Sequence, residues 1–561
     1  IALGDYSYSI EKADWLAEKT LIESKLQGLA FAVTNENETL LVRTLGKASE
    51  KEKVNPNTKF YLGSVSKVFT ALLVLKLVEE GKLVLDKPIT FYLKDLKLIP
   101  RNQNDSPPTI RQILYHHSGL PSDEFYNFVN DKNVVLSNIK FYHTLRKKEI
   151  YMAETPGKVM SYSNLGYSLL GILIEETSKK TLEDYAKEKL FTPLQMYNTS
   201  YYYKENEENF SKGFQGSKVL EPMYIRDLPA GSVHSTIQDM QNFVKFLANM
   251  GKFQGKVIFQ PKTIEEMFKI QKGSLYDFDF KIALPLWIAH NVQDNMHLYG
   301  HGGDVPPFHA YLGVNPNQKQ GIVLMTNTFS SASLLENLGK EILSNFYEAK
   351  TGSKPFVKLA KIQKNISKTW QNWEGNYLTP VGWVNVEAKE NYLKTNQPIV
   401  FIPESENEFL YKIRLFFGLI PLNISAIQNY RVKFNKDSNN KKFFAITVLD
   451  KFIMMYGQEK EKKQVSDVWK KRTGKYKVIN PTAKSFLKDF EISYSGSDEL
   501  IYLNYKIELG QTIPSITCID IVSENLGYTE GLGRNAGIAL VWENTPQGEV
   551  LQFSGYKLKR D

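Results

Sequence analysis

The sequence contains a single cysteine, Cys518, among 561 residues. One thiol excludes an intrachain disulfide and any metal site built from several thiolates. The sequence also has no run of about 18 or more apolar residues, so no membrane-spanning helix is predicted. Neither a disulfide framework nor a membrane span therefore organises this chain.

Strong charge of one sign is also missing. The 70 Lys and Arg residues exceed the 61 Asp and Glu residues by only nine, and they are spread along the chain. We interpret this excess as solvated surface, with attraction to acidic envelope polymers or a membrane surface as the alternative. No segment resembles a nucleic-acid-binding module, so we expect no nucleic-acid partner.

The length predicts two or three domains, and the 42% hydrophobic content allows a large core. Beyond Gly352 the composition changes to short alternating segments rich in Lys, Tyr, Phe and Asn, which is typical of an all-β, barrel-like module. We predict a first domain over residues 1–350, a linker over 351–370 and the β-module over 371–561.

Two weakly similar segments raise a further alternative for this module. Residues 373–377 read Trp-Glu-Gly-Asn-Tyr and residues 472–476 read Arg-Thr-Gly-Lys-Tyr. Each could begin one half of the β-module, and the halves would span residues 371–468 and 469–561.

The first domain is predicted to be α+β. Residues 11–28 have the pattern of an amphipathic helix, and residues 29–33 and 40–45 that of a strand pair. Helical patterns dominate from about residue 88 to 249, including helices at 181–190 and 236–248 that each open with a threonine cap. Strand patterns return after residue 284, and a helix follows at 331–347. We therefore predict an antiparallel sheet assembled from both ends of the domain, flanked by helices, with an inserted helical domain.

The segment Gly63-Ser64-Val65-Ser66-Lys67 opens a long apolar run. On a helix, residues three apart lie on one face, so the Ser64 hydroxyl and the Lys67 amine should be neighbours. A lysine at the start of a buried helix is either paired or loses its proton. A serine beside such an amine is a candidate nucleophile.

Two later segments add polar groups of the same kind. Tyr162-Ser163-Asn164 should project a proton-transferring hydroxyl and an orienting amide from one loop. His301-Gly302-Gly303 ends a strand pattern, where glycines would let a substrate backbone lie close and the imidazole could bind a carbonyl or carboxylate.

The ordered motifs Ser64-x-x-Lys67, Tyr162-x-Asn164 and His301-x-Gly303 resemble the serine β-lactamase/penicillin-binding-protein superfamily. The resemblance is greatest to its class C-like branch of β-lactamases, D,D-carboxypeptidases, D-aminopeptidases and family VIII esterases. It covers about residues 15–350. The C-terminal region loosely resembles the lipocalin-like β-domain of some members. Flanking segments that agree with the branch are residues 62–70, 114–121 and 229–239.

The resemblance implies acyl transfer in two steps. Ser64 would attack a carbonyl, Lys67 or Tyr162 would take its proton, and water would hydrolyse the acyl-enzyme. The sequence does not decide which of Lys67 and Tyr162 is the general base. Asn164 would orient Lys67 or a substrate amide. The oxyanion hole would be the backbone N–H groups of Ser64 and Asp304. The resemblance implies no metal and no organic cofactor.

His301 departs from class C β-lactamases, which have a lysine in the third motif. Histidine is mostly neutral near pH 7, so it offers no fixed charge to a β-lactam carboxylate. We therefore expect a serine peptidase for D-amino-acid-containing or cell-wall-like peptides. A carboxylesterase of the same fold and a non-catalytic penicillin-binding-like sensor or binding protein are the alternatives.

Other patterns receive structural interpretations. His297, His301 and His309 lie in a Gly- and Pro-rich strand segment rather than on a helix, so we expect no metal site there. His116 and His117 precede a turn and should make structural hydrogen bonds. Residues 531–537, Gly-Leu-Gly-Arg-Asn-Ala-Gly, superficially resemble a dinucleotide loop but have the wrong glycine spacing, which favours a hairpin loop.

The sequence begins with Ile1 rather than Met, which a cleaved signal peptide or trimming would each explain. We expect a periplasmic or secreted bacterial protein whose ligand is a small peptide or ester. The β-module is also a candidate surface for homo-oligomer formation.

Overall fold

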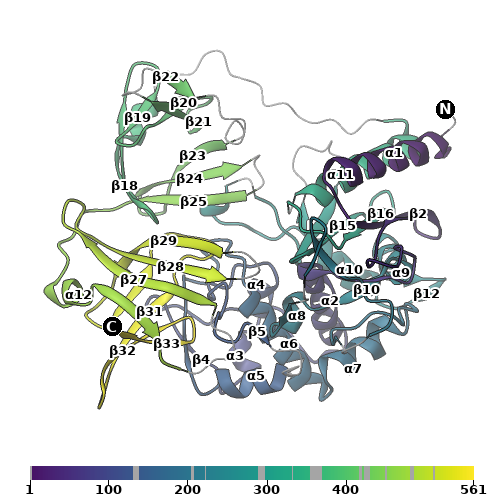
Figure 1. Cartoon of the computed structure of the whole chain (residues 1–561), viewed down its shortest axis with the longest axis horizontal. Coiled ribbons are helices and arrows are strands. Elements are labelled where there is room, and N and C mark those ends of the chain that lie inside the picture. Colours follow the sequence, from purple (N-terminus) through teal and green to yellow (C-terminus); the bar gives the residue numbers. More distant parts are fainter. Residues whose placement is uncertain are drawn as a thin grey trace.

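The computed structural model describes residues 3–130, 138–203, 207–220, 223–278, 280–288, 297–331, 333–353, 369–415, 420–422, 430–448, 452–480, 486–508 and 512–561. Figure 1 shows a larger mixed domain with two β-barrels packed on one side of it. Most of the linker predicted for residues 351–370 lies outside the described residues.

An antiparallel sheet forms the centre of the first domain, in the order β13-β14-β15-β16-β1-β2. Strand β1 pairs with β16, with Phe31 opposite Leu324, so the two ends of the domain meet in the middle of the sheet. The predicted assembly of one sheet from both ends is confirmed. The strands are β1 (Gly28–Thr34), β2 (Thr39–Gly46), β13 (Trp287–Ile288), β14 (Tyr299–Val305), β15 (Phe308–Asn315) and β16 (Gln320–Thr326).

Strand β1 is buried on both faces because helices cover both sides of the sheet. Leu29, Phe31 and Val33 pack with α1 (Ser7–Glu23) and α11 (Leu334–Thr351). The intervening Ala30 and Ala32 belong to the main core, which includes α9 (Ile237–Ala248). Alternate residues of a strand point to opposite faces, which explains this division.

A helical block is inserted between β2 and β13, as predicted. Its core surrounds α2, whose residues are buried almost all round. Thr181 and Thr236 cap their helices through bonds from the amides of Asp184 and Asp239, each at 3.1 Å. The helices are α2 (Ser66–Glu79), α3 (Ile89–Tyr92), α4 (Ile110–Leu114), α5 (Asn138–Leu145), α6 (Asn164–Ser178), α7 (Leu182–Ala186), α8 (Leu228–Gly231) and α10 (Pro261–Phe268).

The β-module forms two barrels. In the first, β17 pairs with β25 and β20 with β21, which closes the sheet. In the second, β26 pairs with β33. The first contains β17 (Gly375–Thr379), β18 (Gly382–Ala388), β19 (Leu393–Thr395), β20 (Ile399–Pro403), β21 (Glu408–Leu415), β22 (Ile420–Leu422), β23 (Tyr430–Lys436), β24 (Lys442–Val448) and β25 (Phe452–Glu459). The second contains β26 (Gly474–Val478), β27 (Leu487–Ser495), β28 (Leu500–Glu508), β29 (Thr512–Ile521), β30 (Leu526–Thr529), β31 (Ala539–Thr545), β32 (Gly548–Phe553) and β33 (Tyr556–Arg560).

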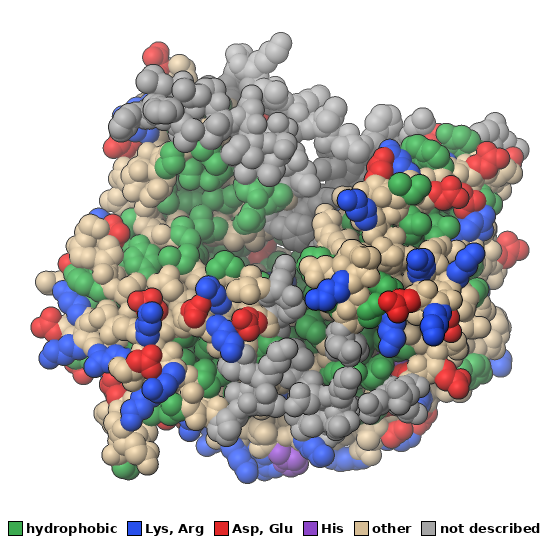
Figure 2. Space-filling view, in the orientation of Figure 1, with side chains coloured by type: hydrophobic (Ala, Val, Ile, Leu, Met, Phe, Trp, Pro, Cys, Tyr) green, Lys and Arg blue, Asp and Glu red, His purple; other side chains and the backbone are tan. Residues whose placement is uncertain are grey.

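Both barrels contact the first domain through specific bonds. The Tyr456 hydroxyl of the first barrel donates to the carbonyl of Tyr276 at 2.9 Å. Asp520 of the second barrel pairs with Arg101 at 2.7 Å. On the face in Figure 2, basic and acidic side chains are interspersed, which agrees with a solvated, mixed-charge surface. Among the described residues, no helix is long and apolar enough to cross a membrane.

Candidate active site

Ser64 lies in the 3₁₀ turn Gly63–Val65, and Lys67 lies in the first turn of α2, which begins at Ser66. The Lys67 Nζ is 3.3 Å from the Ser64 Oγ, the closeness that the Ser-x-x-Lys spacing predicts. The Ser66 hydroxyl donates to the carbonyl of Gly63 at 2.6 Å and holds the turn against the helix.

Lys67 is fully buried, and its amine has two short bonds to oxygen. The Nζ donates to the Asn164 Oδ1 and to the carbonyl oxygen of Ala230, both at 2.7 Å. Burial lowers the pKa of Lys67 well below its usual value. A neutral amine has two hydrogens, and these two acceptors use both. The nitrogen lone pair is then left for the Ser64 hydroxyl, the arrangement that a general base requires.

Tyr162 lies against the same amine. The Lys67 Nζ is 4.7 Å from the centre of the Tyr162 ring. Burial raises the pKa of Tyr162 above its usual value, although hydrogen bonding with the Ser64 side chain lowers it. Tyr162 therefore keeps its proton near neutral pH and is suited to donating one.

Asn164 opens helix α6, where the Ser163 hydroxyl accepts from the amide of Gly166 at 2.9 Å. The Asn164 Nδ2 donates to the Asp123 Oδ1 at 2.7 Å. A carboxylate only accepts hydrogen bonds, so Asp123 fixes which end of the amide faces Lys67. Asp123 was not predicted as a site residue, because an isolated acid after a loop forms no recognisable sequence pattern.

His301 lies on β14 and is 2% exposed. Its Nδ1 donates to the carbonyl of Gly302 at 2.6 Å, and its ring centre is 6.3 Å from that of Tyr162. Burial lowers the pKa of His301 to about 4, and the nearby Lys67 acts in the same direction. His301 is therefore neutral at pH 7, as its residue type predicts.

Gly303 and Gly63 allow β14 to approach the Ser64 turn. A Cβ on Gly303 would lie 1.9 Å from the carbonyl oxygen of Leu62 and 3.0 Å from the amide nitrogen of Ser64. A Cβ on Gly63 would lie 2.4 Å from the amide nitrogen of Asp304. The space beside the Gly303 Cα is thus filled by the backbone of the Ser64 turn. This close approach brings the backbone amides of Ser64 and Asp304 near each other.

His116 and His117, which the sequence predicts to have structural roles, make hydrogen bonds within the fold. The His116 Nδ1 accepts from the amide of Ser163 at 3.1 Å. His117 contacts the Asp277 carboxylate at 2.7 Å and the carbonyl of Tyr115 at 2.9 Å. Within the part of the chain that the structure describes, no group of three or more His, Cys, Asp or Glu side chains could hold a metal ion.

One site residue comes from the second barrel. Residues 531–537 connect β30 to the adjacent strand β31, as expected of a hairpin loop. Arg534 of this loop lies with its guanidinium carbon 4.8 Å from the centre of the Tyr162 ring. No pattern in the sequence indicates this placement, since the two residues are far apart in the chain.

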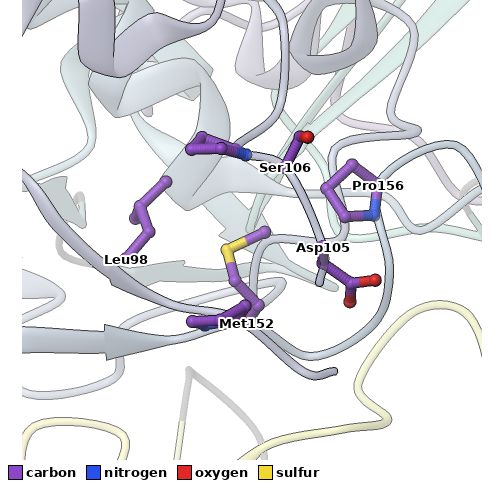
Figure 3. Close-up of a pocket in the computed structure, with 7 residues that line it drawn as sticks. Leu98, Asp105, Ser106, Met152 and Pro156 are labelled. Carbon is purple, nitrogen blue, oxygen red and sulfur yellow. The ribbon is translucent and has the colours of Figure 1, made fainter. Parts of the chain in front are cut away.

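A separate small pocket lies away from these residues (Figure 3). Its volume is about 40 Å³, enough for a water molecule or two but not for a peptide. Its lining residues are Leu98, Pro100, Asp105, Ser106, Pro107, Met152 and Pro156.

Known proteins share both the sequence and the fold. Residues 14–344 match the Beta-lactamase family. Protein flp of Staphylococcus aureus (strain NCTC 8325 / PS 47) is 27% identical over 349 residues, which cover 60% of this chain and 67% of that protein. Beta-lactamase-like protein 2 of Dictyostelium discoideum is 21% identical over 464 residues, which cover 78% of this chain and 83% of that protein.

Two solved structures share the architecture. The octameric penicillin-binding protein homologue from Pyrococcus abyssi matches with a TM-score of 0.50 and 18% identity, over 98% of this chain and 99% of its own. A class C β-lactamase matches with a TM-score of 0.50 and 21% identity, over 61% of this chain and 97% of its own. The resemblance inferred from the three motifs is therefore confirmed, and with more than half of its length matched, the chain belongs to the Beta-lactamase family of serine hydrolases.

Proposed function

We propose that this protein cleaves amide bonds of D-amino-acid-containing or cell-wall-like peptides through an acyl-Ser64 intermediate. The observation that carries the proposal is the buried Lys67 amine, 3.3 Å from the Ser64 Oγ, with its two other hydrogen-bonding directions satisfied by oxygen acceptors. A relative that has lost catalysis would not need a lysine of lowered pKa beside a serine.

In the first step the Ser64 Oγ attacks the carbonyl carbon, and the Lys67 Nζ takes the hydroxyl proton. The carbonyl oxygen becomes an oxyanion that accepts hydrogen bonds from the amides of Ser64 and Asp304. The Tyr162 hydroxyl then gives its proton to the departing amine and regains one from the Lys67 ammonium. Water attacks the acyl-enzyme with the same groups acting in reverse.

The pKa shifts support this division of roles. Burial favours neutral Lys67, which can accept a proton, and protonated Tyr162, which can donate one. The reverse assignment would require a tyrosinate in a site that disfavours it. Neutral His301 lacks the fixed charge of the lysine that class C β-lactamases carry there, so the third motif itself does not favour the carboxylate of a β-lactam.

The first test is labelling by a fluorophosphonate probe and a fluorescent penicillin. The wild-type protein should be labelled by the fluorophosphonate, and Ser64→Ala should not. Ser161→Ala is the matched control. Ser161 precedes Tyr162 and its hydroxyl has no hydrogen-bond partner among the described residues, so this variant should still be labelled. A wild-type protein that takes neither label and turns over no activated ester would refute the hydrolase proposal.

The second test separates a peptidase from the alternative esterase. D- and L-amino-acid p-nitroanilides should be compared with p-nitrophenyl esters of the same acids. We expect the D-anilides to be cleaved faster than the L-anilides. Turnover of esters alone would favour the carboxylesterase, and equal cleavage of both anilides would remove the stereospecific part of the proposal.

We also propose that the protein self-associates through its barrels. The penicillin-binding protein homologue from Pyrococcus abyssi, which matches nearly the whole chain, is described as octameric. Sedimentation velocity should give a species larger than the monomer, and a monomer at micromolar concentration would exclude this.

A further inference from the structure

The loop that carries Arg534 is fixed onto the catalytic domain. The amide of Asn535 donates to the Ser122 hydroxyl at 2.9 Å. Gly537 packs so closely that a Cβ there would lie 2.4 Å from the carbonyl oxygen of Ala153. Leu532 is buried in a cluster with Val159. Ser122 directly precedes Asp123, and Val159 lies three residues before Tyr162, so the loop is anchored at the edge of the site.

The guanidinium of Arg534 lies over Tyr162, yet it is not neutralised. Arg534 is exposed, and among the described residues it has no ion pair or hydrogen bond through its side chain. After burial, its positive charge is among the largest influences on the pKa values of Lys67, Tyr162 and Asp123, and it lowers all three. The charge therefore acts on the reacting groups themselves.

Among the described residues of the first domain, no side chain offers a comparable charge at the site. Burial keeps His301 neutral, and the same effect favours neutral Lys67. The Asp304 carboxylate is partly exposed but contacts the His309 Nδ1. The His309 Nε2 accepts from the amide of Ser330 at 3.1 Å, so Nδ1 carries a proton and donates to Asp304. Within the described ranges, Arg534 is thus the exposed, unpaired ionic group that borders the reacting residues.

We propose that Arg534 is a specificity-determining residue that binds a carboxylate of the substrate beside the scissile bond. This inference rests on the proposed function and narrows its substrate class to anionic peptides. A guanidinium presents a planar set of donors that matches a carboxylate with two parallel bonds. The second barrel therefore supplies the fixed positive charge that the third motif, with histidine, does not. A substrate with an ammonium group at this place would be repelled.

The test measures binding in the Ser64→Ala background, so that it does not depend on turnover. The ligands are an N-acetylated D-amino-acid dipeptide with a free C-terminal carboxylate and the same dipeptide as its C-terminal amide. Calorimetry should give a dissociation constant about 10- to 100-fold lower for the acid, the worth of a hydrogen-bonded charge pair. Adding Arg534→Gln should abolish this ratio, and Arg534→Lys should retain part of it.

Lys477→Gln is the matched control. Lys477 is an exposed lysine of β26 in the same barrel, paired with Asp561, so the variant removes one positive charge elsewhere. It should keep the preference for the acid. The preference should also fall as salt is raised, because the guanidinium is exposed.

Two results would overturn the inference: equal binding of acid and amide by the Ser64→Ala protein, or a preference that survives Arg534→Gln. Thermal unfolding of each variant would show that a lost preference is not lost folding. If fluorophosphonate labelling fails while the binding preference depends on Arg534, the proposed hydrolase function fails and the carboxylate site stands. If labelling succeeds and the preference is absent, only the carboxylate site fails.

Discussion

Replacing Gly303 by alanine should disable the oxyanion hole without touching a reacting side chain. The added Cβ would lie 1.9 Å from the Leu62 carbonyl oxygen, about 1 Å inside the closest approach that Cβ atoms make. The three nearest atoms, the carbonyl oxygen and carbon of Leu62 and the amide nitrogen of Ser64, all belong to the backbone, so no flexible side chain can move aside. Strand β14 must therefore move away from the Ser64 turn by about 1 Å.

That displacement sets the expected loss. Oxyanion donors act at about 2.7–3.1 Å, and a bond lengthened by about 1 Å is no longer a hydrogen bond. Losing the Asp304 amide should lower kcat for an activated ester by about 10²–10³-fold. The overpacking should also lower the free energy of unfolding by about 1–3 kcal/mol. Stopped-flow acylation and urea unfolding would measure the two effects.

Gly302 provides a control on the same strand. A Cβ on Gly302 would meet no atom within 4 Å, so Gly302→Ala should keep kcat within a few fold. If Gly303→Ala acylates as fast as the wild type, the close approach of β14 does not build the oxyanion hole. Equal damage from both variants would mean that any added methyl group disturbs this strand.

Three further changes test the roles of side chains around Ser64. Lys67→Met should lower kcat/KM for an activated ester by about 10²–10⁴-fold, the usual contribution of a general base, whereas near-wild-type rates would favour Tyr162 as the base. Asp123→Asn should lower kcat about 10-fold, because an amide at this position no longer forces Asn164 to turn its oxygen toward Lys67; an unchanged kcat would show that other contacts hold that amide. Arg534→Gln should move the acidic limb of kcat/KM to higher pH, because removing a positive charge raises the pKa of Lys67 and keeps the amine protonated for longer; a shift to lower pH would contradict this sign.

Short-range patterns predicted much of the first domain. The strand at residues 29–33 and the threonine caps of α7 and α9 depend on neighbours a few residues away, and the structure has them as expected. The predicted helix ends were less accurate. The helix expected at residues 11–28 spans Ser7–Glu23, and the helix expected at 331–347 spans Leu334–Thr351. Helix ends depend on capping and packing that periodicity alone does not contain.

The sequence by itself determined the pairing of Ser64 with Lys67, because three residues of helical chain bring their side chains together whatever surrounds them. Only the tertiary structure decided what makes this pair chemically unusual. Tyr162 and Asn164, which help to bury the amine, come from almost 100 residues away. The oxygen of Ala230 and the guanidinium of Arg534 come from segments more than 150 residues away. No local pattern encodes such contacts, since they exist only after the sheet, the helical insert and the second barrel have packed together.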